Sequence, residues 1–183
     1  MTFRNTTRSW GTLSKTLHWI IVLLIINQWV LGQWSESLTG LPKLKVLGYH
    51  KSFGMTILML AVIRLAWRLM NPVPDLGAET KPWERVLAKI SHVLLYGLIF
   101  AMPLTGWLMS SAKTYSVSWF NLFAFPNLVG KNDRVYHLTN DLHHQLFNVL
   151  LAVAALHIVG ALKHHFIDKN HVLKRMLPFG GAK

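Results

Sequence analysis

The sequence contains no cysteine among its 183 residues, and charged residues make up only 14% of it. The absence of cysteine excludes disulfide bonds, thiolate-bound zinc or iron–sulfur clusters, and haem attached covalently through a C-x-x-C-H motif. A soluble domain carries charge on about a quarter of its residues, and a disordered chain is poor in apolar residues. The 52% hydrophobic content therefore argues against both classes. Any cofactor must be held by other ligands, and the ten histidines are the abundant candidates for binding a transition metal.

Acidic residues are also scarce: 19 Lys and Arg stand against 7 Asp and Glu, which gives a formal net charge of +12. A strongly basic chain can indicate nucleic-acid binding. Here, however, the Lys and Arg residues gather at the ends of long apolar runs, where they would meet lipid headgroups. We therefore expect membrane lipid as a partner and no nucleic acid.

Four segments are long and apolar enough to cross a bilayer, which takes roughly 20 residues of helix. A lipid-exposed strand edge would leave backbone groups unpaired, and four segments are too few for a barrel, so each segment is predicted to be helical. The predicted fold is an all-α membrane protein, a four-helix transmembrane bundle formed by one integral-membrane domain over residues 1–183. The spans run approximately over residues 17–34, 49–70, 86–109 and 143–166.

The distribution of positive charge predicts the orientation of these spans. With four spans both termini share one side, and that side collects 13 of the 19 Lys and Arg residues. The positive-inside rule then predicts that both termini lie on the cytoplasmic side of the membrane, which in a bacterium is the inner membrane. The first span follows a basic front like that of a secretory signal, but no small-x-small cleavage site follows it, so we expect it to be retained. The outer loop over residues 110–142 carries Trp119, Phe120, Phe123 and Phe125 and is expected to lie on the outer membrane surface.

Histidines fall within or at the ends of all four spans, namely His18, His50, His92, His143 or His144, and His157. One intramembrane histidine is readily explained as a hydrogen-bonded core residue. Five of them on four helices favour a site in the bundle interior, because ionisable groups are costly in lipid and bundle cores commonly hold cofactors.

Helix geometry favours two stacked haems. At about 100° and 1.5 Å per residue, His143 and His157 lie about 40° apart on one face with a rise of about 21 Å, whereas His144 lies about 140° from His157. We therefore prefer His143 as a ligand and expect His144 at the interface. His50 begins the second span on the outer side and can pair with His143. Either His18 or His92 can pair with His157, and spacing alone does not choose between them.

Two histidine ligands fill both axial positions of a haem iron, which favours electron transfer over oxygen binding. Arg64 and Arg68 share a face on the inner half of the second span and are candidates to pair with haem propionates. The alternative is that they reach the cytoplasmic surface as topology anchors, which suits Arg68 better than Arg64.

Several stretches together resemble the bacterial cytochrome b561 family, the small di-haem quinone-linked membrane cytochromes, over nearly the full chain. The matching stretches are Ser14-Lys-Thr-Leu-His18-Trp19, Gly48-Tyr-His50-Lys-Ser-Phe-Gly54, Arg64-Leu-Ala-Trp-Arg68, Asn71-Pro72-Val-Pro74, His92, Pro103-Leu-Thr-Gly106, His143, His157, Lys163-His164-His165-Phe166 and Lys174-Arg175-Met176-Leu-Pro178.

The resemblance implies two non-covalent haem b groups, with His50 and His143 as ligands of the outer iron and His18 and His157 as ligands of the inner iron. It leaves His92 as an interior residue that does not bind iron. His92, His164 and Arg64 are then candidates to contact a haem propionate or a quinone.

Members similar to this chain oxidise superoxide and pass the electron to ubiquinone, which implies a superoxide:ubiquinone oxidoreductase. Outer basic residues could attract the superoxide anion or another small electron donor, or bind headgroups instead. A second copy of the chain is a further candidate partner. The basic residues are Lys43, Lys45, Lys51, Lys113, Lys131 and Arg134, and the acidic residues near them are Glu36, Asp133 and Asp141.

Two other functions fit the sequence less well. A cytochrome b subunit of a quinone-linked dehydrogenase or hydrogenase has a similar plan of helices and histidines but needs a docking surface for an iron–sulfur partner, and no dedicated docking domain is evident. A histidine-lined transporter is of a different class, and no intramembrane Asp or Glu and no inverted repeat support it.

Overall fold

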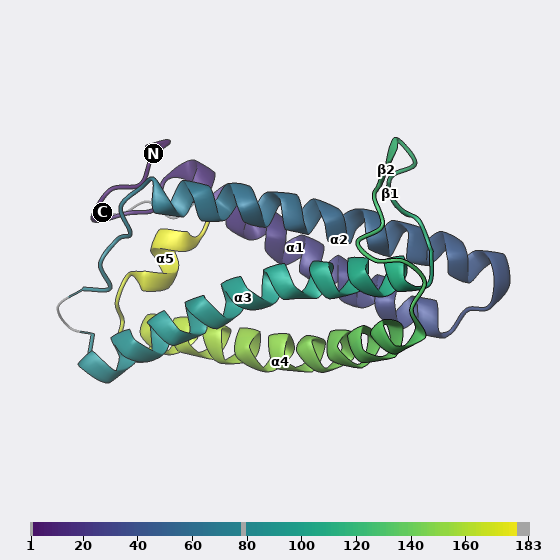
Figure 1. Ribbon diagram of the computed structural model, residues 1–183. Helices are drawn as coiled ribbons and strands as arrows, with labels where there is room; N and C mark the ends of the chain where they lie inside the picture. The colour runs from purple at the N-terminus through teal and green to yellow at the C-terminus, as the bar shows by residue number, and fades with distance from the viewer. Residues whose placement is uncertain (1, 78–79, 179–183) are drawn as a thin grey trace. The chain divides into compact units, whose positions relative to one another are not determined.

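The computed structural model describes residues 2–77 and 80–178, and four long helices dominate it (Figure 1). All four are long and apolar enough to cross a membrane. The prediction of an all-α chain with four such helices is therefore confirmed. The helices and strands are α1 (Thr12–Glu36), α2 (Gly40–Leu69), α3 (Pro82–Ala112), β1 (Val117–Trp119), β2 (Phe123–Phe125), α4 (Asp133–Phe166) and the short α5 (Val172–Met176).

Each long helix begins before the apolar segment predicted from the sequence, and capping bonds support the added first turns of α3 and α4. Pro82 occupies the first turn of α3, and the Glu84 carboxylate accepts the backbone N–H of Lys81 at 3.1 Å. At the start of α4, Asn132 Oδ1 accepts the backbone N–H of Val135 at 3.1 Å. The helix therefore begins ten residues before the apolar run that was predicted to start at His143.

The chain divides into two compact units. We call them the terminal unit, Met1–Ile20 with Val62–Gly97 and Leu150–Lys183, and the central unit, Ile21–Ala61 with Leu98–Val149. In the terminal unit, Trp19 Nε1 donates to the Met176 carbonyl oxygen at 2.9 Å, and Arg175 donates to the carbonyl oxygens of Arg8 and Asp75. These bonds connect α5 to the N-terminal segment and to the α2–α3 connection.

A β-hairpin occupies part of the loop between α3 and α4 in the central unit (Figure 1). Phe120 and Asn121 form its turn with φ of 48° and 61°. Ser52 of α2 lies 2.9 Å from the Ser118 carbonyl oxygen and accepts the Phe120 N–H, while Trp119 Nε1 donates to Thr56 Oγ1 at 3.0 Å. The aromatic residues of this loop therefore belong to an ordered hairpin that packs on α2, which the sequence reading did not foresee.

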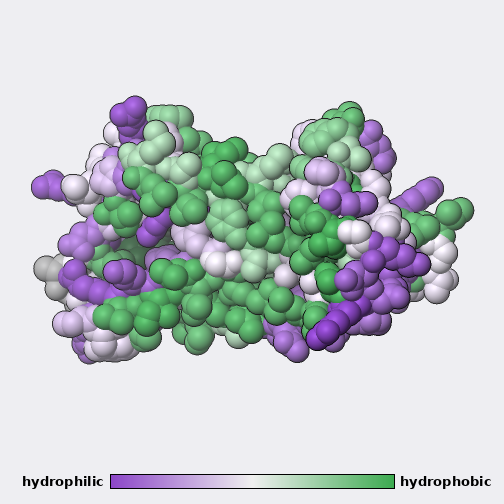
Figure 2. Space-filling model, in the orientation of Figure 1, coloured by the Kyte–Doolittle hydropathy of each residue, from purple (hydrophilic) through white to green (hydrophobic). Residues whose placement is uncertain are grey.

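Large apolar side chains cover the outside of the long helices. Leu23, Val62, Val93 and Leu156 are each more than half exposed. Figure 2 shows hydrophobic residues over long stretches of the visible surface and hydrophilic residues gathered near the helix ends. Such a surface is unfavourable in water and favourable in the hydrocarbon core of a bilayer.

Candidate functional site

In the central unit, His50 of α2 and His143 of α4 face each other. Their ring centroids lie 6.3 Å apart at an interplanar angle of 67°. Both side chains are half-buried, whereas the neighbouring His144 is exposed. The structure therefore brings together the two histidines that the sequence paired for an outer site.

Glycines stand beside both of these rings. A Cβ at Gly32 would lie 3.8 Å from His50 Cε1, and one at Gly106 would lie 3.3 Å from His143 Cε1. Cε1 is the ring carbon between the two nitrogens. The Gly106 distance is tighter than an ordinary contact, so glycine keeps this edge of the His143 ring clear, whereas the Gly32 distance is an ordinary contact. Glycine is the residue that allows such a close approach of the backbone.

Buried polar atoms without a protein partner lie in the same unit. Among the described residues, His50 Nδ1 and Gln28 Oε1 are buried and have no hydrogen-bond partner. The Gln28 side chain donates through Nε2 to the backbone carbonyl oxygen of His50 at 2.9 Å. Buried polar atoms are normally paired, so both atoms are exceptions that a bound group could satisfy; the others among the described residues are Asn27 Nδ2 and His165 Nδ1.

In the terminal unit, three histidines from three helices come together. The ring centroids of His18 and His157 lie 6.5 Å apart, and those of His92 and His157 lie 5.2 Å apart. His157 is therefore the shared member of two candidate pairs, as the sequence also indicated.

The distances can be compared with the requirement of a six-coordinate iron. A bond of about 2 Å from metal to imidazole nitrogen, with each ring centroid about 1 Å behind its nitrogen, separates two trans imidazole centroids by about 6 Å. The pairs His50–His143 and His18–His157 meet this requirement, and the His92–His157 pair is closer than it allows. The residues present therefore fit two bis-histidine haem sites, one in each unit.

Arg64 and Arg68 lie near the histidine group of the terminal unit. Arg64 Nη1 donates to the Ser14 carbonyl oxygen at 3.2 Å, and both Arg64 and Arg68 approach the Tyr96 ring, at 6.0 and 5.6 Å. Together with Trp10 and Trp67 these residues line a small cavity. Both arginines thus contact protein groups, and neither simply extends into solvent.

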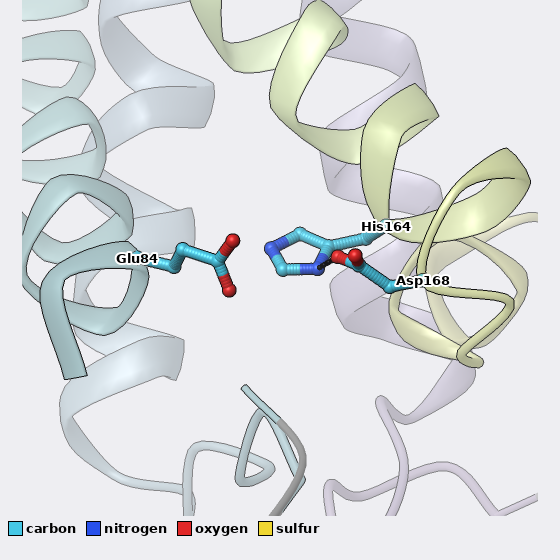
Figure 3. A group of neighbouring side chains, drawn as sticks. All are labelled: Glu84, His164 and Asp168. Atoms are coloured by element: carbon cyan, nitrogen blue, oxygen red, sulfur yellow. Dashed lines mark ion pairs between the residues drawn. The ribbon is translucent and has the colours of Figure 1, made fainter. Parts of the chain in front are cut away.

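His164 takes part in an ionic cluster at the end of α4, shown in Figure 3. His164 Nδ1 lies 2.8 Å from Asp168 Oδ2 and 3.1 Å from Asn170 Nδ2, and Figure 3 shows the opposite edge of the ring turned towards Glu84. The ligand atoms of Glu84, His164 and Asp168 lie within 4.8 Å of one another. However, the Lys163 ammonium already contacts both carboxylates, so the cluster carries its own cation and gives no ground for a metal site.

This cluster predicts a pH dependence of stability. The Lys163 ammonium holds the pKa of the Asp168 carboxyl below its usual value of 3.8. A carboxyl with a depressed folded-state pKa contributes stability above its unfolded pKa and loses that contribution as the pH falls through the folded value. We therefore expect the melting temperature of the detergent-purified protein to fall below about pH 4, and to fall less steeply in Lys163→Met.

Lys174→Met, at an exposed position on α5, is the matched control and should follow the wild-type melting curve at every pH. Melting curves of Lys163→Met that coincide with those of the wild type from pH 3 to 7 would rule out a stabilising role for the cluster.

The outer basic residues are only partly available to attract an anion. Lys113 pairs with Asp133 at 2.7 Å, and this carboxylate raises the pKa of the lysine. Lys51 donates to the Ser116 carbonyl oxygen at 3.2 Å. Lys45, Lys131 and Arg134 are exposed. The uncompensated positive charge of this cluster therefore lies mainly on the exposed residues.

Several residues around His50 and His143 were not predicted from the sequence. Thr105 lies 3.0 Å from His143 through Oγ1, Gly32 and Gly106 line the two rings, and Gln28 bonds to His50. Thr105 and Gly106 belong to the Pro103–Gly106 stretch that carried the resemblance. The sequence stretch therefore marked these two residues, but their contact with His143 joins two helices and could not be predicted from the sequence.

Comparison with known proteins identifies the family of the chain. The profile of the family described as prokaryotic cytochrome b561 matches residues 9–179. Cytochrome b561 homolog 2 of Escherichia coli K12 is 34% identical over 179 residues, covering 97% of this chain and 95% of the relative. The probable superoxide oxidase CybB of Yersinia pestis is 29% identical over 177 residues, covering 93% and 97%, and cytochrome b562 of Cereibacter sphaeroides is 26% identical over 171 residues, covering 90% and 92%.

Proposed function

Because the chain belongs to the prokaryotic cytochrome b561 family, whose members are haem b-binding electron-transfer proteins of the membrane, we propose that it is a di-haem superoxide:ubiquinone oxidoreductase. Superoxide is oxidised on the outer side of the membrane and ubiquinone is the acceptor. Support for the donor comes from a relative at 29% identity that is named a probable superoxide oxidase.

The observation that carries this proposal is the pair of histidine separations, 6.3 Å for His50–His143 and 6.5 Å for His18–His157. Each pair supplies two imidazoles at the spacing of trans ligands. Haem b, when bound between such a pair, supplies one-electron transfer with no open coordination position. His50 with His143, and His18 with His157, would each hold one haem through their imidazole nitrogens.

On the inner side, Arg64, His92 and His164 are the candidates to contact a propionate or a quinone. Arg64 offers a guanidinium beside Trp67 and Tyr96, and a guanidinium suits an anionic carboxylate or a quinone carbonyl. His92 lies against His157 and so adjoins the inner site. His164 Nδ1 is occupied by Asp168 and Asn170, so His164 could contact a propionate or a quinone only through the opposite ring edge, which faces Glu84.

On the outer side, exposed basic residues of the central unit would raise the local concentration of the superoxide anion. The proposal places this side in the periplasm of a bacterium and both termini in the cytoplasm, in keeping with the excess of Lys and Arg at the inner helix ends. It treats the chain as one integral-membrane domain, with a second copy as a candidate partner.

A reduced-minus-oxidised spectrum with a pyridine haemochrome titration tests the cofactor part. We expect sharp low-spin b-type bands and two haems per chain. Superoxide generated in the presence of excess ubiquinone should then reduce the haems, as seen by their absorbance bands, and the quinone. Added superoxide dismutase should abolish both reductions. Increasing ionic strength should slow reduction of the bands, because salt screens the attraction of an anion.

The outcomes separate the parts of the proposal. A colourless protein would reject the cytochrome. A di-haem protein that superoxide fails to reduce, but that a quinol or a copurifying dehydrogenase reduces, would reject the proposed donor while keeping the cytochrome.

A further inference from the structure

The Pro103–Gly106 stretch of α3 lies directly against the His143 ring. Thr105 Oγ1 is 3.0 Å from His143 Nδ1, and a Cβ at Gly106 would come within 3.6 Å of that same nitrogen. All of these residues belong to the central unit. We propose that Thr105 is a positioning residue for the outer haem: its hydroxyl fixes the tautomer and rotation of His143 and thereby lowers the potential of that haem. This inference rests on the proposed di-haem function.

The direction of the hydrogen bond follows from the other contacts of the hydroxyl. Thr105 Oγ1 also lies 2.9 Å from the carbonyl oxygens of Ala101 and Met102, one turn earlier in α3. A hydroxyl has one proton, and the carbonyls can only accept, so the proposal gives that proton to a carbonyl and leaves the lone pairs of Oγ1 for His143. His143 holding iron through Nε2 would carry its proton on Nδ1, so this nitrogen would donate to Oγ1. The tautomer with the proton on Nδ1 leaves Nε2 unprotonated, which is the form that binds iron.

The neighbouring elements explain why this contact forms here. Gly106 follows Thr105 directly and leaves its backbone bare next to His143 Cε1, so the ring can come close enough to α3 for the bond to form. Pro103 has no backbone N–H, so the helix lacks one of its own hydrogen bonds in the same turn. Pro103, Thr105 and Gly106 therefore make up the turn of α3 that lies against the His143 ring.

The two proposed ligands of the outer iron are supported differently. His50 Nδ1 has no side-chain partner among the described residues, whereas His143 Nδ1 has Thr105. Thr105 is thus the side chain that orients a ligand ring in this pair. A hydrogen bond from Nδ1–H makes an imidazole a stronger donor, and a stronger donor stabilises ferric over ferrous iron. Loss of the hydroxyl should therefore raise the potential of one haem.

The test is a potentiometric titration of the holoprotein, followed optically, on Thr105→Val, Thr105→Ser and Thr139→Val. Loss of a hydrogen bond to a metal ligand commonly changes binding about tenfold. A tenfold change in the ferric-to-ferrous ratio corresponds to about 59 mV for one electron. We expect Thr105→Val to raise one of the two midpoint potentials by about this amount, or to lose that haem, and Thr105→Ser to restore the wild-type value.

Thr139→Val is the matched control, because the Thr139 hydroxyl bonds to the carbonyl oxygens of Val135 and Tyr136 one turn earlier and to no histidine. It should leave both potentials unchanged. The inference is overturned if Thr105→Val keeps two haems at wild-type potentials, or if Thr105→Ser behaves like Thr105→Val. Failure of the proposed function is a separate outcome, since wild-type protein would then bind fewer than two haems.

Discussion

Replacing His18 with alanine is expected to reduce the haem content from two per chain to one, whereas replacing His92 with alanine is expected to keep both. Both side chains lie against His157, so both variants remove a neighbour of the same ring. Only the His18–His157 separation of 6.5 Å leaves room for an iron between two imidazoles, because trans centroids need about 6 Å. The 5.2 Å between His92 and His157 is a direct ring contact.

The pyridine haemochrome assay on detergent-purified variants measures this directly, and low-spin bands show whether the remaining iron keeps two strong ligands. His144→Ala serves as the control, because this exposed histidine lies on the same helix as two proposed ligands and its ring neighbours His143, not the His18–His92–His157 group. One haem in His92→Ala together with two in His18→Ala would reverse the proposed pairing. A rise in high-spin signal in His92→Ala with two haems retained would place His92 in contact with the inner site without making it a ligand.

Much of the fold follows from the sequence because the bilayer imposes strong requirements. A helix must present about 20 apolar residues to cross it, and such runs are visible without any knowledge of tertiary contacts. The four runs correspond to α1 to α4. The helix ends were less predictable, since the first turn of α4 is polar and depends on local bonds such as that from Val135 to Asn132.

The histidines were predictable for a related reason: an ionisable side chain in lipid demands an explanation, so His50 and His143 could be paired from depth alone. The inner pair could not, because His18 and His92 lie at similar depth and differ in their distances to His157. The β-hairpin was equally inaccessible. Ser52 and Thr56 bind it through side-chain bonds to residues more than 60 positions away.

The largest effect outside the histidines is expected at Gly106. A Cβ at this position would lie 3.3 Å from His143 Cε1, which is already tight. The branched side chain of valine extends beyond that Cβ towards the ring, and a packed interior resists such an insertion. We therefore expect Gly106→Val to displace His143 and to lower the haem content from two per chain to one.

Gly97→Val is the matched control, because Gly97 lies on the same helix and a Cβ there would meet no atom within 4 Å. It should keep two haems, which separates displacement of His143 from a general effect of valine on α3. Gly106→Ala adds only the tight Cβ, so it should keep both haems, with a changed potential at one of them. If Gly106→Val retained two haems with unchanged potentials, His143 could not be a ligand held against this face of α3. In that case Thr105 would lose its proposed role as well, since both residues act on the same ring.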